Sequence, residues 1–189
     1  VPAASASPEG PKPAAIQYLT ESEAMEPLIE RIKAAGIKVQ SRKEEDPFGA
    51  GMLRVGNATV CLTDGRTATQ TSFEDELPNV VMLDLSRDFA TSKRVVLAKG
   101  EETTAAALAD AVGLFRAVGF EVSVIEDVPG MIVARTIAML ANEGADAVLQ
   151  GVADAVGVDT AMKLGLGHPE GPLATADRIG MTLMNAILI

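Results

Sequence analysis

The sequence predicts an α/β domain followed by an all-α domain. Short apolar runs bounded by Gly, Pro or polar residues alternate with helical patterns as far as Ile125, which is typical of strands and helices that share one sheet. From Asp127 onward the apolar residues recur only at the spacing of amphipathic helices. The chain has 189 residues, of which 48% are apolar, so it can bury a core in each of two small domains.

The predicted α/β domain spans residues 16–127 and follows a segment, residues 1–15, that is rich in Pro, Ala and Ser like an extended linker. A strand at 16–19, a helix that ends near Gly36 and a strand at 37–40 predict a βαβ unit with parallel strands. The other predicted elements of this domain are a Gly-rich loop at 46–56, strands at 59–63, 80–85, 95–98 and 120–125, and a helix at 101–118.

The predicted helical domain spans residues 128–189 and contains no strand pattern. Pro129 suits the first turn of a helix, where its missing N–H needs no partner. An apolar stripe predicts that this helix continues to Gly151; the stripe consists of Val133, Ile137, Leu140, Gly144 and Val148. Shorter helices are predicted at 156–164 and from Pro172 onward. Because the chain stops inside an apolar helical pattern, we expect this domain to be truncated at its end.

Charge and composition narrow the classes of partner and location. The net charge is −10, with 16 basic residues scattered among 26 acidic ones, which argues against nucleic acid. No stretch approaches the ~20 apolar residues of a membrane span, so we expect no membrane partner. The single cysteine, Cys61, permits no intrachain disulfide and favours a reducing compartment, so we expect a cytoplasmic location.

Patterns that mark a catalytic or cofactor site are incomplete or absent. Gly49-Ala50-Gly51 lacks the third glycine of a dinucleotide fingerprint, and Gly165-Leu166-Gly167 closes a helix where that fingerprint would open one. The only histidine, His168, lies beside Pro169 in what we expect to be a structural loop. The acidic runs 44–46 and 74–76 are predicted to be solvated loops. We therefore predict no catalytic, cofactor-binding or metal-binding residue in this chain.

One block of sequence contains several short motifs whose order and spacing together are distinctive. It begins with Asp127-Val128-Pro129-Gly130, continues with Asn142-Glu143 and Gly151-Val152-Ala153, and contains the run from Asp159 to Leu173. That run includes Gly165, Gly167, His168, Pro169, Glu170, Gly171 and Pro172, and Asp177 follows it. The block resembles the C-terminal domain of 3-hydroxyacyl-CoA dehydrogenases.

The resemblance implies structural roles for most of these residues and substrate contact for two. Residues expected to shape helix ends and loops are Pro129, Gly130, Glu143, Gly165, His168, Pro169, Gly171, Pro172 and Asp177. Arg135 and Asn142 are the expected substrate contacts. The family usually has Asn just before this Arg, whereas here the residue is Ala134, which can neither donate nor accept a hydrogen bond. The family's catalytic His–Glu pair and glycine fingerprint lie upstream, in a cofactor domain that this chain lacks.

Residues 16–127 resemble, less specifically, a reduced Rossmann-like domain that lies between two helical modules in long bacterial members of the family. The implied fold is a small α/β Rossmann-like domain followed by an all-α domain of the 3-hydroxyacyl-CoA dehydrogenase C-terminal type. The implied enzyme oxidises 3-hydroxyacyl-CoA to 3-oxoacyl-CoA in fatty-acid beta-oxidation, with NAD bound outside this chain. We expect this portion to be inactive alone and to serve packing, dimerisation and acyl-CoA contact.

A homodimer is expected from the resemblance and from apolar residues of the last helix: Ile179, Leu183, Ile187 and Leu188. Two other functions are compatible with the residues. One is a non-catalytic assembly module that kept the fold, and the other is an unrelated α/β ligand-binding domain. A glycine fingerprint upstream in the native gene would favour the dehydrogenase over both, and an assay of the whole gene product would separate it from the assembly module.

Overall fold

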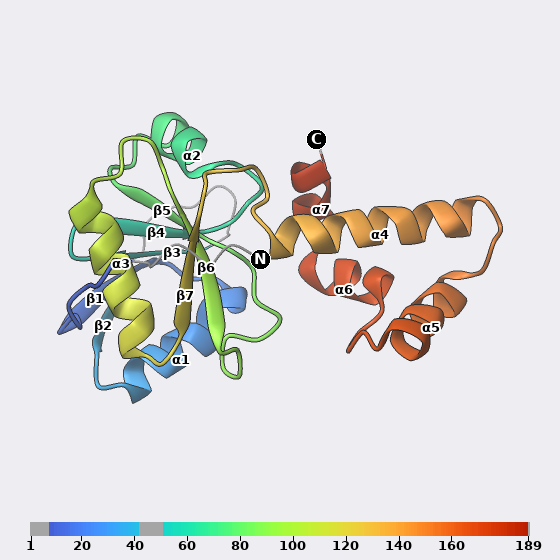
Figure 1. The fold of residues 1–189 in the computed structure, drawn as a ribbon, viewed down its shortest axis with the longest axis horizontal. Coiled ribbons are helices and arrows are strands. Elements are labelled where there is room, and N and C mark those ends of the chain that lie inside the picture. Colours follow the sequence, from blue (N-terminus) through green and yellow to red (C-terminus); the bar gives the residue numbers. More distant parts are fainter. Residues whose placement is uncertain (1–7, 42–50, 189) are drawn as a thin grey trace. The chain divides into compact units, whose positions relative to one another are not determined.

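The computed structural model describes residues 8–41 and 51–188. The chain forms two compact units, Val1–Met131 and Ile132–Ile189, which we call the α/β unit and the helical unit. Figure 1 shows a sheet with helices in the first unit and helices in the second. This is the order of fold classes that the sequence predicts.

A mixed seven-stranded sheet forms the centre of the α/β unit, in the order β2-β1-β3-β4-β5-β6-β7. Its strands are β1 (Ala15–Thr20), β2 (Lys38–Ser41), β3 (Met52–Val55), β4 (Ala58–Leu62), β5 (Val80–Leu83), β6 (Arg94–Lys99) and β7 (Glu121–Ile125). β1 pairs in parallel with β2, as do β4 with β5 and β6 with β7, and the other pairs are antiparallel. Helix α1 (Glu26–Ala34) connects β1 to β2, so the predicted parallel βαβ unit is confirmed.

Alternation of side chains along the strands builds a core on each face of the sheet. In β5, Val81 and Leu83 join the core that includes residues of α1 and of α3 (Ala105–Ala117), whereas Val80 and Met82 join the core beneath α2 (Ala68–Glu74). Because helices cover both faces, every residue of β5 is buried, and its sequence is a continuous apolar run.

Within the segment predicted as a loop at 46–56, the structure describes a strand, β3. Val55 pairs with Ala58 across the two-residue turn Gly56-Asn57, in which Gly56 has a φ of 53°. The carboxylate of Asp110 in α3 accepts a hydrogen bond from the Asn57 N–H at 2.9 Å. The prediction was wrong because pairing with β1 and β4 stabilises a strand that is too short for a clear local pattern. The acidic run 44–46 and residues 49–50 lie outside the described residues.

Helix α2 was also missed, because its sequence is polar. Thr67 and Gln70 form a capping box, in which each side chain accepts a hydrogen bond from the other residue's N–H at 3.0 Å. This Thr-x-x-Gln pattern is a recognised helix-start signal. Glu74 ends the helix, and it binds Arg66 together with Asp75, so the expectation that 74–76 is only a solvated loop is corrected.

The described part of the Pro-rich first segment lies against the α/β unit. A Cβ atom added to Gly10 would stand 1.7 Å from the carbonyl oxygen of Ala109 in α3, and one added to Gly113 would stand 2.3 Å from the carbonyl oxygen of Pro11. Lys12 Nζ donates a hydrogen bond to the Ala35 carbonyl at 2.9 Å. The two glycines therefore permit a close backbone approach that larger residues would prevent.

The helical unit consists of α4 (Val133–Leu149), α5 (Ala155–Leu166), α6 (Pro172–Ile179) and α7 (Met181–Leu188). Helix α4 begins four residues later than the Pro129 start that the sequence predicts. Gly130 and Met131 have φ values of 67° and 52°, and left-handed residues in succession turn the chain before the helix can begin.

The buried side of α4 is made of small residues: Ala134, Ala138, Ala141 and Gly144. Of the predicted apolar stripe, only Gly144 is buried, and its larger members are half-buried. A Cβ atom added to Gly144 would lie 3.3 Å from Leu173 Cδ2 and 3.4 Å from Val158 Cγ1, so α5 and α6 approach α4 closely there. The close approach of these helices gives the small residues the most buried positions.

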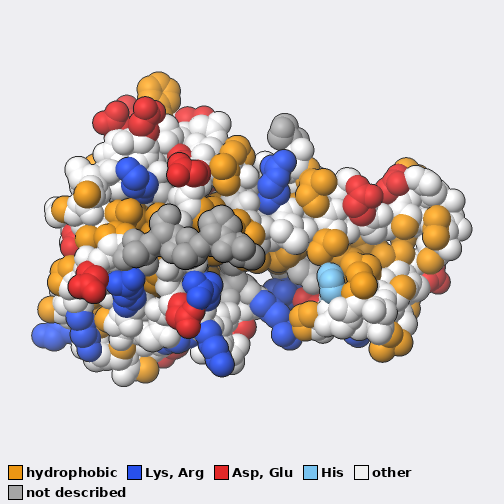
Figure 2. Space-filling model, viewed as in Figure 1, with side chains coloured by type: hydrophobic (Ala, Val, Ile, Leu, Met, Phe, Trp, Pro, Cys, Tyr) orange, Lys and Arg blue, Asp and Glu red, His pale blue; other side chains and the backbone are white. Residues whose placement is uncertain are grey.

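Helix α5 buries none of its residues. Exposed apolar side chains gather on and just before it, and we call the following five the apolar set: Leu149, Val152, Val156, Leu164 and Leu166, which are 69% to 84% exposed. Figure 2 shows hydrophobic side chains on the surface of the helical unit. Of the last-helix residues expected at a dimer interface, Ile187 is buried and Leu183 is half-buried. Among the described residues, no helix is long and apolar enough to cross a membrane.

Candidate functional site

The start of α2 is held by a carboxylate from the end of β7. Asp127 accepts hydrogen bonds from the Ala68 N–H at 2.7 Å, from the Thr69 N–H at 2.9 Å and from the Thr69 hydroxyl at 2.6 Å. Thr69 Oγ1 in turn accepts a hydrogen bond from the Glu101 N–H at 3.0 Å. In many α/β proteins the N–H groups at a helix start bind a phosphate. Here the protein's own carboxylate takes that position.

A cavity of about 630 Å³ lies beside this helix start, where the parallel strands β6 and β7 end. Its polar lining comes from Thr67, Thr69, Lys99, Glu101, Glu126 and Asp127. Ligands of α/β sheets commonly bind at the carboxyl ends of parallel strands. This cavity, however, offers three carboxylates and one amine, so its electrostatic character opposes a phosphate group.

Arg66 lies in the loop that leads into α2, and sequence reasoning did not identify it. Its guanidinium contacts Asp64 at 2.7 Å, Asp75 at 2.8 Å and Glu74 at 2.9 Å, and its side chain is 18% exposed. The hydrogen bond to Asp75, and then those to Asp64 and Glu74, hold the pKa of Arg66 above its ordinary value although burial lowers it. These contacts fasten both ends of α2, so the cluster is a structural one.

In the helical unit, the specific block forms a helix–loop–helix. The Asp159 carboxylate of α5 accepts hydrogen bonds from the Leu173 N–H at 2.9 Å and from the Ala174 N–H at 3.0 Å, at the start of α6. A Cβ atom added to Gly171 would stand 2.1 Å from Asp159 Cγ, so only glycine fits this loop without a shift. Pro172 occupies the first turn of α6, as its residue type predicts.

The loop between α5 and α6 contains His168. Gly167 ends α5 in the left-handed conformation with a φ of 70°, whereas Gly165 lies inside the helix and not in the turn where it was expected. The His168 N–H donates to the Met162 carbonyl at 3.3 Å, and its side chain is half-buried. Pro169 and Asp177 are exposed, while Glu170 forms an ion pair with Arg178 at 2.8 Å.

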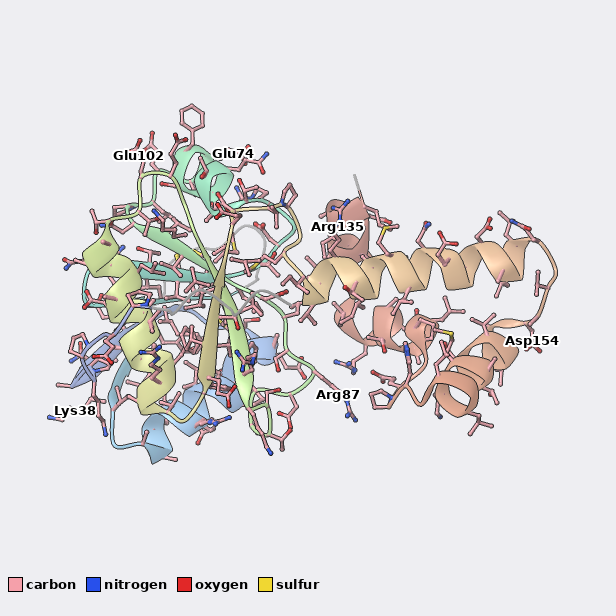
Figure 3. The ribbon with its side chains drawn as sticks, viewed as in Figure 1. Lys38, Glu74, Arg87, Glu102, Arg135 and Asp154 are labelled. Atoms are coloured by element: carbon pink, nitrogen blue, oxygen red, sulfur yellow. The ribbon has the colours of Figure 1, made fainter. Side chains whose placement is uncertain are left out.

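The two expected substrate contacts lie on α4. Arg135 and Asn142 are both exposed, and their separation of seven residues places them on one side of the helix, about two turns apart. Figure 3 shows Arg135 near the beginning of α4. Ala134 is fully buried, and Glu143 is exposed. The side chains of Arg135 and Asn142 form no hydrogen bond or ion pair with another described residue.

The described side chains form no group of three or more His, Cys, Asp or Glu that could hold a metal ion. Cys61 is the single cysteine of the chain and is buried in β4, within the core beneath α2. Within the α/β unit, Asp127 binds backbone N–H groups, and Asp64, Glu74 and Asp75 bind the Arg66 guanidinium. Within the helical unit, Asp159 binds backbone N–H groups. What the geometry provides is therefore helix capping and a cavity with a hydrophilic wall.

Two family models divide the chain at the turn before α4. The 3-hydroxybutyryl-CoA dehydrogenase reduced Rossmann-fold domain matches residues 60–129. The 3-hydroxyacyl-CoA dehydrogenase C-terminal domain matches residues 130–189, so that the two together cover more than half of the chain. The chain belongs to the 3-hydroxyacyl-CoA dehydrogenase family. Its fold class is the one that the sequence predicts, and an unrelated ligand-binding domain is excluded.

The names of individual relatives agree with this family assignment. The 3-hydroxyadipyl-CoA dehydrogenase of Escherichia coli (strain K12) is 34% identical over 130 residues, which are 69% of this chain and 26% of that protein. The 3-hydroxybutyryl-CoA dehydrogenase of Bradyrhizobium diazoefficiens is 36% identical over 116 residues, which are 61% of this chain and 36% of that protein. The crystal structure of 3-hydroxybutyryl-CoA dehydrogenase from Escherichia coli K12 has a TM-score of 0.66 at 32% identity, and the match covers 77% of this chain and 29% of that one.

The chain spans only 26% and 36% of the length of these two relatives. Sequence reasoning identified its helical block but missed the capping roles of Asp127 and Asp159. No local signal reports such contacts, because their partners lie 58 to 59 and 14 to 15 residues away in the chain. The start of α2 itself was detectable from its capping box.

Proposed function

We propose that this chain is the C-terminal portion of an NAD-dependent dehydrogenase of 3-hydroxyacyl-CoA thioesters such as 3-hydroxybutyryl-CoA. The observation that carries the proposal is the succession of two domains of one dehydrogenase family in a single chain. Relatives that share this stretch are named for 3-hydroxyadipyl-CoA and 3-hydroxybutyryl-CoA. The place that we assign to this reaction is fatty-acid beta-oxidation in the cytoplasm, and the single buried cysteine, Cys61, agrees with a reducing compartment.

The proposed reaction converts the 3-hydroxyl group into a ketone. C3 loses a hydride, the hydroxyl loses a proton to a base, and 3-oxoacyl-CoA is released. NAD supplies the oxidising chemistry when bound, and we assign both its site and the base to the part of the enzyme outside this chain. Three features support that assignment: Asp127 occupies the start of α2, carboxylates line the adjacent cavity, and the only histidine lies in the α5–α6 loop.

The test of this assignment is an assay of the purified 189-residue chain with 3-hydroxybutyryl-CoA and NAD, following NADH absorbance. We expect no turnover above a blank without enzyme. The 3-hydroxyadipyl-CoA dehydrogenase of Escherichia coli, assayed in the same batch, is the positive control. Steady turnover by the chain, at a rate that follows chain concentration through a final purification step, would contradict the assignment.

We assign to α4 a contact with acyl-CoA through Arg135 and Asn142. Both side chains are exposed on one side of the helix and have no partner among the described residues, so they can bind a ligand without breaking an existing contact. Calorimetric titration of the chain with 3-hydroxybutyryl-CoA tests this role. Arg135→Ala should weaken binding by about fivefold or more, whereas Lys163→Ala, which removes an exposed basic residue of α5, should leave it unchanged. Equal affinities of wild type and Arg135→Ala would remove the role.

The helical unit is also proposed to hold two copies of the chain together. Helix α5 has no buried residue, and the apolar set lies exposed on and just before it. Exposed apolar patches above a few hundred Å² usually mark interfaces. A two-fold homodimer is the simplest assembly. Leu164→Glu should shift the mass from dimer to monomer in light scattering. Phe73→Glu is the matched control, because Phe73 is 86% exposed on α2, in the other unit. A wild-type monomer at micromolar concentration would refute the dimer.

The second candidate function is a non-catalytic assembly module that kept the family fold. Ala134 favours it, because a buried alanine replaces the polar residue that the family resemblance leads one to expect there. An assay of the whole gene product separates the two functions. Oxidation of 3-hydroxybutyryl-CoA by the whole product supports the dehydrogenase, and a folded whole product without turnover supports the assembly module.

A further inference from the structure

The first described residues of the chain, 8–13, touch the α/β unit at three separate places, and we call them the strap. Close to β1, the Lys12 amine donates a hydrogen bond to the carbonyl of Ala35, the C-cap residue of α1, at 2.9 Å. A cation near the C-terminal end of a helix also interacts favourably with the helix dipole. At the far end of the strap, Pro8 forms part of the wall of the cavity beside the start of α2.

The middle of the strap packs against α3 through two glycines that face each other. A Cβ atom added to Gly10 would stand 1.7 Å from the Ala109 carbonyl oxygen and 2.8 Å from the Gly113 nitrogen. A Cβ atom added to Gly113 would stand 2.3 Å from the Pro11 carbonyl oxygen and 2.7 Å from the Gly10 carbonyl carbon. Neither glycine has a left-handed φ, so the requirement for glycine comes from space and not from backbone conformation.

The residue types on both sides suit this contact. Gly113 is buried in the interior of α3, where glycine is less favourable than alanine, and the three atoms nearest to an added Cβ all belong to the strap. Pro8, Pro11 and Pro13 have a fixed φ and no N–H, so an extended segment that contains them loses less conformational freedom when it packs. Glycine at position 113 therefore serves the contact with the strap and not the stability of α3.

We propose that the strap is a latched part of the α/β unit: the pair Gly10 and Gly113 fastens it to α3, and its Pro8 end closes one side of the cavity. Residues 8–13 then have a role beyond that of the extended linker that their composition predicts. Release of this latch would uncover Gly113 and widen the entrance to the cavity. The strap does not depend on the proposed dehydrogenase function, because all of these contacts lie within one unit.

Cleavage of the whole chain after Glu9 by a glutamate-specific protease tests the latch. Glu9 is exposed, but its bond to Gly10 can enter a protease only when the strap leaves α3, and the cleavage rate follows the population of that open form. Gly113→Ala should accelerate this cleavage by about tenfold or more, because the added Cβ atom and the Pro11 carbonyl cannot occupy the same place. Cleavage after Glu102, in an exposed turn of the same unit, should keep its rate. Mass spectrometry identifies the products, and equal rates after Glu9 in the two proteins would overturn the proposal.

The matched control is Gly165→Ala, because Gly165 is also a glycine inside a helix, and an added Cβ atom there meets nothing within 4 Å. This variant should leave cleavage after Glu9 unchanged. If Gly113→Ala also accelerates cleavage after Glu102, the variant unfolds as a whole, and the backbone order parameter of Gly10 in the wild type decides. The latch requires a value near that of a rigid backbone, about 0.85, and a value below about 0.6 would refute it.

The Pro8 end of the strap has a measurement of its own. Relaxation of the Val124 and Ile125 methyl groups by a soluble paramagnetic probe should increase in Gly113→Ala, because these side chains line the same cavity as Pro8. Unchanged relaxation together with faster cleavage after Glu9 would contradict the closing of the cavity by the strap.

Discussion

The two units bury different kinds of residue. The α/β unit covers large side chains completely, including Leu97, Leu114 and Phe115, between its sheet and its helices. The buried side of α4 consists of alanines and a glycine, and α5 leaves the apolar set exposed. Apolar area removed from water stabilises a fold by roughly 25 cal/mol per Å². The α/β unit therefore gains more stability from buried large side chains than the helical unit, whose apolar set is exposed.

The largest expected effect comes from making the same substitution in both units. Leu114→Ala in α3 removes a fully buried side chain and should lower the free energy of unfolding by about 2–5 kcal/mol. Leu164→Ala in α5 removes one that is 82% exposed and should change it by less than about 0.5 kcal/mol. Urea unfolding at submicromolar concentration measures both. Similar losses for the two variants would break the comparison.

The next effect concerns an arginine in each unit. Arg31 donates hydrogen bonds to the carbonyls of Val118, Phe89, Ser92 and Gly119 at 2.7 to 3.2 Å and lies 3.8 Å from the ring centre of Phe120. Arg31→Ala leaves these carbonyls unpaired and should cost about 2–3 kcal/mol. Arg178 pairs with Glu170 at a more exposed position, so Arg178→Ala should cost at most about 1 kcal/mol. Thermal unfolding followed by circular dichroism compares them, and an equal loss would show that exposure does not control the value of these contacts.

Two glycines of the helical unit should respond with opposite sign. Gly171→Ala places a Cβ atom 2.1 Å from Asp159 Cγ, so the α5–α6 loop must shift, at about 1–3 kcal/mol. Gly165→Ala adds a Cβ atom with nothing within 4 Å, inside a helix, and should stabilise the unit by about 0.5–1 kcal/mol. The same urea titrations measure both variants, and destabilisation by Gly165→Ala would mean that α5 is packed more tightly than its exposure indicates.

The smallest expected effect is a change in how stability depends on pH above neutrality, and it concerns Tyr18 of the α/β unit. Burial raises the pKa of Tyr18 above its ordinary value of 10.0, although the hydrogen bond with Ser22 lowers it. Because the folded state holds this proton more tightly, the contribution of Tyr18 to stability is complete below pH 10.0 and is lost as pH rises through its folded pKa. Unfolding titrations at pH 8 and pH 11 should show a smaller alkaline loss for Tyr18→Phe than for wild type. Equal losses of stability for the two proteins would mean that other titratable groups determine the decrease in stability at high pH.

The local sequence pattern was sufficient to predict an element where the burial of its residues follows a simple periodicity. The apolar run 80–85 predicts β5 because helices cover it on both sides, and α3 shows a clear helical period. It was insufficient for β3, whose few residues are stabilised by β1 and β4, and for α4, where closely packed helices bury the alanines more deeply than the larger stripe residues. In both cases the structure depends on neighbouring elements. The periodicity of the local sequence does not show which elements these are or how closely they approach.

By itself the sequence determined the order of the two domains and the family, because these depend on residue types at fixed local spacing, whereas it placed the start of α4 four residues too early. Only the tertiary structure decided what the acidic residues do. Asp127 and Asp159 are the same residue type, yet one fastens the chain after β7 to the start of α2 and the other fastens α5 to the start of α6. The physical reason is that a carboxylate binds whichever N–H groups the fold brings within about 3 Å, and those groups belong to helices that begin elsewhere in the chain.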